Sequence, residues 1–159
     1  MSIKTADLLD AHPEFEACTS GLTHFGGVRR FAGTVATLQC FEDNSLIREA
    51  LRSPGFGRVL VVDGGASLRC ALVGDVLAAA GRDSGWAGVI VNGCVRDSVV
   101  LGELAFGVMA LGVQPRRSEK RGQGVRDGVL ELFGARVRPN DMVYVDEDGV
   151  VFVPQGVAI

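Results

Sequence analysis

The stretch Arg58-Val59-Leu60-Val61-Val62-Asp63-Gly64-Gly65 contains a run of valine and leucine followed by two glycines. This run predicts a buried strand, and the Gly-Gly pair predicts the turn that follows it. A second apolar run, Ala87–Val91, is followed by Asn92-Gly93, which we expect to close that strand. Between them, an alanine-rich stretch from Asp75 to near Gly81 favours a helix. Strand, helix and strand in this order require a crossover connection and a parallel pair of strands.

Elements predicted on either side extend this unit into a mixed sheet. They are a helix over Thr5–His12 capped by Thr5, a strand over Phe31–Phe41, a helix from residues 42–45 to about Arg52, a helical stretch around Val99–Leu104, and strands over Met109–Val113 and Gly134–Arg138. Met142–Asp146 and Val150–Pro154 flank an Asp-Gly turn, which is a strong hairpin signal. We therefore predict an α/β fold, layered β/β/α or mixed, in a single domain over residues 1–159.

Composition indicates a globular protein and narrows the classes of partner. Hydrophobic residues make up 47% of the 159 residues and charged residues 22%, which is not the balance of a disordered chain. The net charge is −3, which argues against direct nucleic-acid binding because such proteins usually carry a basic surface. One basic cluster, Arg116, Arg117, Lys120 and Arg121, is interpreted as a solvated loop.

The four cysteines, Cys18, Cys40, Cys70 and Cys94, show neither CxxC spacing nor a zinc pattern with histidine. Free thiols in a reducing compartment are the simplest interpretation. We expect no signal peptide, and no apolar run reaches the roughly 18 residues that a membrane helix needs. We therefore expect a cytoplasmic protein with no membrane contact.

Charged residues follow the predicted strand ends. Arg96 and Asp97 come just after the second strand, in a short loop that begins at Cys94, and Asp75 begins the intervening helix. Ligands collect at the carboxyl ends of parallel strands. The helix start, Gly74 to Leu77 (Gly74, Asp75, Val76, Leu77), offers backbone N–H groups to a carboxylate, and Gly74 permits close approach of a ligand to the backbone.

These residue types suit one kind of chemistry. The guanidinium of Arg96 matches a carboxylate with two parallel hydrogen bonds. Asp97 offers hard oxygen ligands to Mg²⁺ or Mn²⁺, and Asp75 can hold a water or pass a proton. The spacing of these residues alone is a weak signal. Asp75 also fits a helix-capping residue with no function, and Arg96 and Asp97 also fit an ion pair on the surface. The chain contains no GxGxxG after a strand, no GxxxxGK[ST] and no GxSxG.

Several motifs resemble those of a known family over more than a hundred residues. The chain is similar to the regulator of ribonuclease E activity A (RraA-like) proteins and the related 4-hydroxy-4-methyl-2-oxoglutarate aldolases. The matching stretches are Phe25-Gly26-Gly27, Cys40-Phe41-Glu42-Asp43-Asn44, Val59–Gly65, Ala71–Asp75, Gly93–Asp97 and Tyr144–Gly149. The catalytic members of the family carry Asp, twenty intervening residues and then Arg-Asp, and Asp75, Arg96 and Asp97 have this spacing.

The resemblance implies a role for each of these residues. Asp97 would hold a divalent metal, Mg²⁺ or Mn²⁺, and Arg96 would clamp the pyruvyl oxygens of a small 2-keto acid substrate. Asp75 would position the water that protonates an enolate, and the backbone of Gly74 through Leu77, with Val76 between them, would bind the substrate carboxylate. The implied activity is a class II, metal-dependent retro-aldol cleavage to pyruvate, together with oxaloacetate decarboxylation through a shared pyruvate enolate.

The resemblance also implies a β/β/α swivelling-type fold with a mixed sheet, and a ring-shaped homotrimer. The larger aldolases add an acidic residue from a C-terminal extension, which is not found before Ile159, so we expect oxaloacetate decarboxylation to be at least as easy to detect as aldol cleavage. The alternative function is a protein-binding inhibitor of ribonuclease E. Members that work mainly in this way can lose the Arg-Asp pair, and its presence here favours the enzyme.

Overall fold

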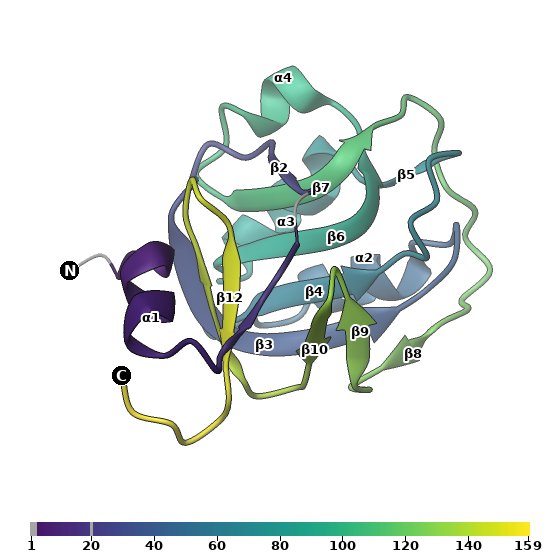
Figure 1. Cartoon of the computed structure of the whole chain (residues 1–159). Coiled ribbons are helices and arrows are strands. Elements are labelled where there is room, and N and C mark those ends of the chain that lie inside the picture. Colours follow the sequence, from purple (N-terminus) through teal and green to yellow (C-terminus); the bar gives the residue numbers. More distant parts are fainter. Residues whose placement is uncertain (1–2, 20) are drawn as a thin grey trace.

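The computed structural model describes residues 3–19 and 21–159. The helices are α1 Thr5–Ala11, α2 Ser45–Leu51, α3 Asp75–Asp83 and α4 Ser98–Leu101. The strands are β1 Glu16–Ala17, β2 Thr23–His24, β3 Phe31–Gln39, β4 Val59–Asp63, β5 Ala71–Val73, β6 Gly88–Val95, β7 Gly107–Val113, β8 Val125–Arg126, β9 Leu130–Leu132, β10 Ala135–Val137, β11 Met142–Val145 and β12 Val150–Val153. Within the described residues a mixed sheet of ten strands curls over itself; α2, α3 and α4 cover one face of its parallel part, antiparallel strands lie against the other face, and α1 packs on β12 (Figure 1).

The centre of the sheet is parallel, as the apolar runs predict. β3, β4, β6 and β7 lie side by side in that order and run in the same direction. Because side chains alternate between the faces of a strand, β4 contributes to two cores. Leu60 and Val62 pack against the helices, whereas Val59 and Val61 face the opposite layer.

The opposite layer consists of antiparallel strands. β11 and β12 form the predicted hairpin, with Val145 opposite Val150, and β9 pairs with β10. β3 joins the two layers, because its first residues pair with β11 and its later residues, from Val35 onward, pair with β4. Helices, parallel sheet and antiparallel strands thus form the three layers of the predicted β/β/α fold.

The prediction that Thr5 caps the first helix is wrong. Lys4 occupies the capping position in extended conformation, and Thr5 lies inside α1. Thr5 instead bonds to the buried Asp146 after β11, with its backbone N–H donating over 2.8 Å and its hydroxyl over 2.7 Å. Burial raises the pKa of Asp146, but these bonds and those from the backbone of Asp148 and Gly149 outweigh it and hold the pKa below its usual value. The threonine therefore fastens α1 to the hairpin.

The prediction that Asn92-Gly93 closes the second strand is also wrong. β6 continues through Cys94 and Val95, so those two residues are not in a loop. Cys94 pairs with Ala71 of β5 on one side and with Gly112 of β7 on the other, and the register shifts between Val91 and Cys94. Asn92 and Gly93 are tolerated inside β6 because they lie at this register shift, and because β5 and β7 still pair with the residues that follow.

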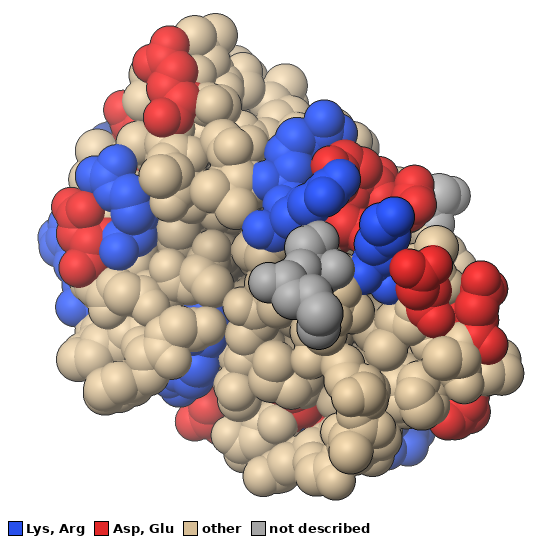
Figure 2. Space-filling model, turned by 90° about the vertical axis from the view of Figure 1, so that its left-hand side faces the viewer, with Lys and Arg blue, Asp and Glu red and all other residues tan. Residues whose placement is uncertain are grey.

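The structure also shows how charge is distributed on one face, whether any helix could span a membrane, and the state of the four cysteines. Figure 2 shows that basic and acidic side chains lie intermingled on the face that carries the termini. No helix in the described part of the chain is long and apolar enough to span a membrane. All four cysteines are free, and burial raises the pKa of Cys18 and of Cys40 to about 12. Thiols with such pKa values stay protonated and are poor nucleophiles.

Candidate functional site

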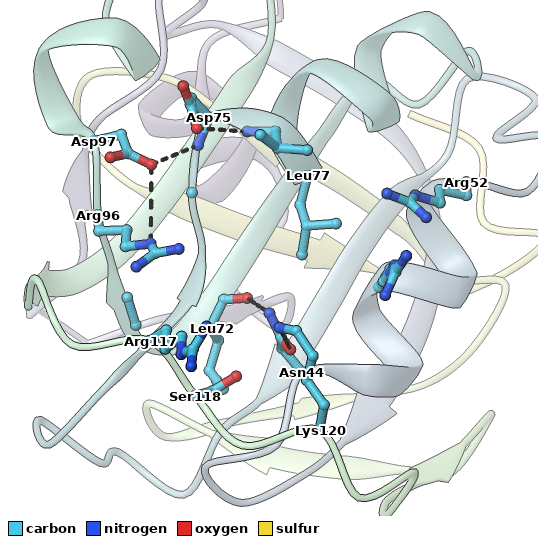
Figure 3. A pocket seen from close by; sticks show the side chains of 14 residues that line it. Asn44, Arg52, Leu72, Asp75, Leu77, Arg96, Asp97, Arg117, Ser118 and Lys120 are labelled. Carbon is cyan, nitrogen blue, oxygen red and sulfur yellow. Dashed lines mark hydrogen bonds and ion pairs between the residues drawn. The ribbon is translucent and has the colours of Figure 1, made fainter.

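A pocket of about 180 Å³ lies where β5 and β6 end and α3 begins. It brings together every residue that the sequence proposed for the site (Figure 3). Segments far apart in the chain complete its wall. The lining residues are Asn44, Arg48, Arg52, Ala71, Leu72, Gly74, Asp75, Val76, Leu77, Arg96, Asp97, Arg117, Ser118 and Lys120.

Asp97 is held against the start of α3. Its Oδ2 atom accepts a hydrogen bond of 3.1 Å from the backbone N–H of Asp75 and lies 4.0 Å from Nε of Arg96. Asp97 has a φ of +58°, a left-handed conformation that aspartate tolerates better than most residues. The backbone N–H of Arg96 donates to the carbonyl of Val73 over 3.0 Å, which joins the end of β6 to the end of β5. The two strand ends thus fix the Arg-Asp pair beside the helix.

Gly74 makes this close approach possible. A Cβ atom at this position would lie 2.6 Å from Oδ2 of Asp97 and 3.2 Å from Cγ of Arg96. The first distance is shorter than real Cβ contacts allow, so any larger residue would displace the Asp97 carboxylate. The absence of a side chain at Gly74 is therefore a requirement of the arrangement.

The N-terminal amides of α3 already bind carboxylates of the protein. The N–H of Asp75 donates to Asp97, and the N–H of Val76 donates to Oδ1 of Asp75 over 2.8 Å. At the predicted anion site, Gly74–Leu77, two backbone N–H groups at the positive end of the helix thus have carboxylate partners within the chain. A substrate carboxylate that binds here would replace the carboxylates of Asp97 and Asp75 as acceptors of these two hydrogen bonds.

The pocket is strongly cationic. Five basic side chains line it against the two carboxylates of Asp75 and Asp97, a balance of three positive charges. The five are Arg48, Arg52, Arg96, Arg117 and Lys120. Arg117 and Lys120 belong to the basic cluster that the sequence suggested was a solvated loop; both are exposed and lie in a loop, as predicted, but they also line the pocket. No motif or spacing in the sequence connects Arg117 and Lys120, or Arg48 and Arg52, with Arg96.

A buried aspartate holds the Lys120 segment in place. Both oxygens of Asp43 accept hydrogen bonds, one from the N–H and hydroxyl of Ser45 and the other from the N–H groups of Arg121 and Gln123. Burial raises the pKa of Asp43, but these bonds, led by that from the Ser45 hydroxyl, outweigh it and lower the pKa. Asp43 is therefore ionised at neutral pH and ties the loop after Lys120 to the start of α2.

Asn44 then orients the lysine itself. Its Nδ2 donates to the carbonyl of Leu72 over 3.1 Å, and its Oδ1 accepts from Nζ of Lys120 over 3.1 Å (Figure 3). Asn44 is buried, so its amide is fixed by both contacts. The ammonium group of Lys120 is thereby held at the edge of the pocket. The Cys40–Asn44 stretch of the resemblance was the one sequence signal for this residue.

Four known proteins that are similar to this chain carry three different names. Proteins of Burkholderia mallei (strain SAVP1) and Burkholderia pseudomallei (strain 668) named as 4-hydroxy-4-methyl-2-oxoglutarate aldolases are 54% identical over 157 residues, 95% of each chain. A structure described as the RNA-processing inhibitor RraA from Thermus thermophilis has a TM-score of 0.95 and 46% identity, and covers 99% of this chain and 96% of its own. One described as S-adenosylmethionine:2-dimethylmenaquinone methyltransferase from Geobacillus kaustophilus has a TM-score of 0.94 and 47% identity, with 98% and 97% covered.

The names differ, but the family does not. The family model described as RraA-like, Aldolase/RraA, matches residues 5–152. This range includes the four helices, all the strands except the last residue of β12, and every residue that lines the pocket. The chain therefore belongs to the RraA-like family.

Proposed function

We propose that the protein is a metal-dependent lyase that cleaves 4-hydroxy-4-methyl-2-oxoglutarate to pyruvate and also decarboxylates oxaloacetate. The observation that carries this proposal is the grouping of Arg96, Asp97 and Asp75 around the start of α3 inside a cationic pocket. The relatives at 54% identity that are named as aldolases support it. The pocket is smaller than the roughly 300–1,000 Å³ of sites for larger ligands, which favours a small anion over a nucleoside-bearing cofactor.

The donor set fits magnesium or manganese. The described residues contain no group of three or more His, Cys, Asp or Glu side chains that could hold a metal, so a cage made only of protein ligands is not available in them. Mg²⁺ does not need one, because it keeps several waters and takes one or two carboxylates plus substrate oxygens. Asp97 would hold the ion, and Asp75, whose backbone N–H contacts Asp97, would orient one of its waters. When bound, the ion supplies positive charge that stabilises a developing enolate.

The residues of the chain account for the remaining steps. Arg96 would bind the pyruvyl oxygens with its planar fork, and the amides of Asp75 and Val76 would bind the substrate carboxylate after releasing their internal partners. In the aldol reaction the C3–C4 bond breaks, the C4 hydroxyl loses its proton and C3 gains one. In the decarboxylation the same bond breaks to give CO₂, and C3 takes a proton from water. Asp75, once released from the Val76 N–H, would handle the proton in both cases.

The direct test is pyruvate release from each substrate with and without Mg²⁺. We expect pyruvate from both compounds in the presence of Mg²⁺ or Mn²⁺, and none above the uncatalysed rate in excess chelator. Adding the metal back should restore the activity, which shows that the chelator has not damaged the protein. Full pyruvate release in excess chelator would contradict the proposed metal dependence. No pyruvate release from either substrate with the metal present would contradict the proposed lyase activity.

The RNA-processing inhibitor at 46% identity supports a second proposal, that the chain regulates a ribonuclease E-type protein through surface contacts. The two functions are compatible, because a small pocket and an outer surface can act independently. The pyruvate measurement separates them: a chain that acts only as a regulator would release no pyruvate from either substrate.

We also propose a homotrimer. Val76 is 65% exposed at the start of α3, and Val99 and Val100 of α4 are 77% and 41% exposed beside Asp97. Adjacent exposed valines next to a site are typical of a surface that a partner covers. Light scattering should give about 50 kDa, three times the chain mass of 16.7 kDa. A mass equal to that of one chain would contradict the trimer.

A further inference from the structure

Two arginines, Arg48 of α2 and Arg52 directly after its last residue, line the pocket without a role in the chemistry described above. Arg48 and Arg52 are four residues apart, so they lie one turn apart on the same side of the helix. α2 can pack closely against α3 because of Gly81, where a Cβ atom would lie 3.1 Å from Cδ2 of Leu51. In Figure 3, Arg52 lies across Leu77 from the Asp75–Asp97 pair. The two arginines therefore form the wall opposite the proposed pyruvyl end.

Within residues 3–19 and 21–159, the side chains of Arg48 and Arg52 make no hydrogen bond or ion pair. The acidic neighbour on the same helix, Glu49, pairs with Arg126 at 3.6 Å instead. Two like charges four residues apart disfavour a helix, so this arrangement has a cost. An anion bound between the two guanidinium groups would offset that cost.

The three other basic groups of the pocket are placed differently. Lys120 is held by Asn44, Arg96 lies beside Asp97, and Arg117 lies on the Arg96 side of the pocket, away from Arg52 (Figure 3). We propose that Arg48 and Arg52 form a subsite for the distal carboxylate of the substrate, so that the protein selects dicarboxylate over monocarboxylate 2-keto acids. This inference rests on the proposed function, which places the pyruvyl half of the substrate at Arg96 and Asp97.

Equilibrium binding tests the subsite without any turnover. The probes are 2-oxoglutarate, which has a distal carboxylate but neither the C4 hydroxyl nor the β-keto acid that cleavage needs, and 2-oxopentanoate, which has the same chain length without that carboxylate. With Mg²⁺ present, calorimetry should show that the natural protein binds 2-oxoglutarate about tenfold more tightly, the lower range for charge-assisted hydrogen bonds to exposed arginines. The double variant R48Q/R52Q should bind 2-oxopentanoate unchanged and lose the preference.

The matched control is R82Q/R136Q, which removes the same charge from two exposed arginines outside the pocket. It should keep the preference, which separates a local subsite from a general effect of net charge. Equal binding of the two keto acids by the natural protein, or a preference that survives R48Q/R52Q, would overturn the subsite alone. Because the measurement needs no cleavage, a protein that releases no pyruvate but shows the preference would overturn the lyase and retain the subsite. Binding of neither keto acid would overturn both.

Discussion

Asp97→Asn is expected to reduce pyruvate release from both substrates by on the order of 10³-fold, because a catalytic metal supplies several kcal/mol and each 1.4 kcal/mol is tenfold in rate. Asparagine has nearly the size of aspartate but lacks the negative charge that binds a hard cation. Its side-chain oxygen can still accept the hydrogen bond from the N–H of Asp75. The change therefore tests the charge of Asp97 and not the shape of the site.

The choice of asparagine follows from the backbone. Asp97 has a φ of +58°, and asparagine tolerates this left-handed conformation, whereas alanine there would add about 1–2 kcal/mol of strain. The matched control is Asp83→Asn at the end of α3, where the carboxylate pairs with Arg82 outside the pocket. Rates at saturating Mg²⁺ and thermal unfolding should be measured on both variants. An Asp97→Asn protein of normal stability that keeps its full rate would show that Asp97 is not a metal ligand.

The central fold could be predicted because its signals are local. The apolar run of β4 and the Asp-Gly turn between β11 and β12 each lie within a few residues, so the sequence alone indicates a buried strand and a hairpin. The two-residue strands β1, β2 and β8 carry no such period, and only their partners make them strands. For the same reason β6 continues through Asn92-Gly93: hydrogen bonds from β5 and β7 outweigh the local preference for a turn.

The candidate site also contains one group of residues that could be predicted from the sequence and one that could not. Arg96 and Asp97 follow a predicted strand, and Gly74 and Asp75 begin the helix before that strand, so their grouping at the carboxyl ends of the parallel strands could be predicted, although the strand β5 before Gly74 was not. The wall opposite them could not. Arg52 reaches the pocket through the packing of α2 on α3, and Lys120 through its bond to Asn44, 76 residues away in the chain. These contacts depend on the finished fold.

Arg96→Lys is expected to lower aldol cleavage and oxaloacetate decarboxylation by a similar factor of about 10²–10³, the usual loss when one donor to a developing negative charge is removed. Lysine keeps the positive charge but replaces the planar fork with a single ammonium group, so two parallel hydrogen bonds to the pyruvyl oxygens cannot form. Arg82→Lys is the control, since Arg82 lies on α3 outside the pocket and pairs with Asp83. Both activities should be measured in the same preparation.

The equality of the two factors is the informative part of that measurement. The fold should tolerate the change, because the Arg96 side chain is 42% exposed and makes one long hydrogen bond, 3.5 Å from Nη1 to the carbonyl of Pro115. The substrates differ beyond C3 and share the pyruvyl half, which is the half assigned to Arg96. A residue that contacts the shared half must slow both reactions together, whereas a residue beyond C3 would not. If Arg96→Lys abolishes one activity and leaves the other intact, the two reactions do not pass through one enolate at this site, and at least one of them belongs elsewhere.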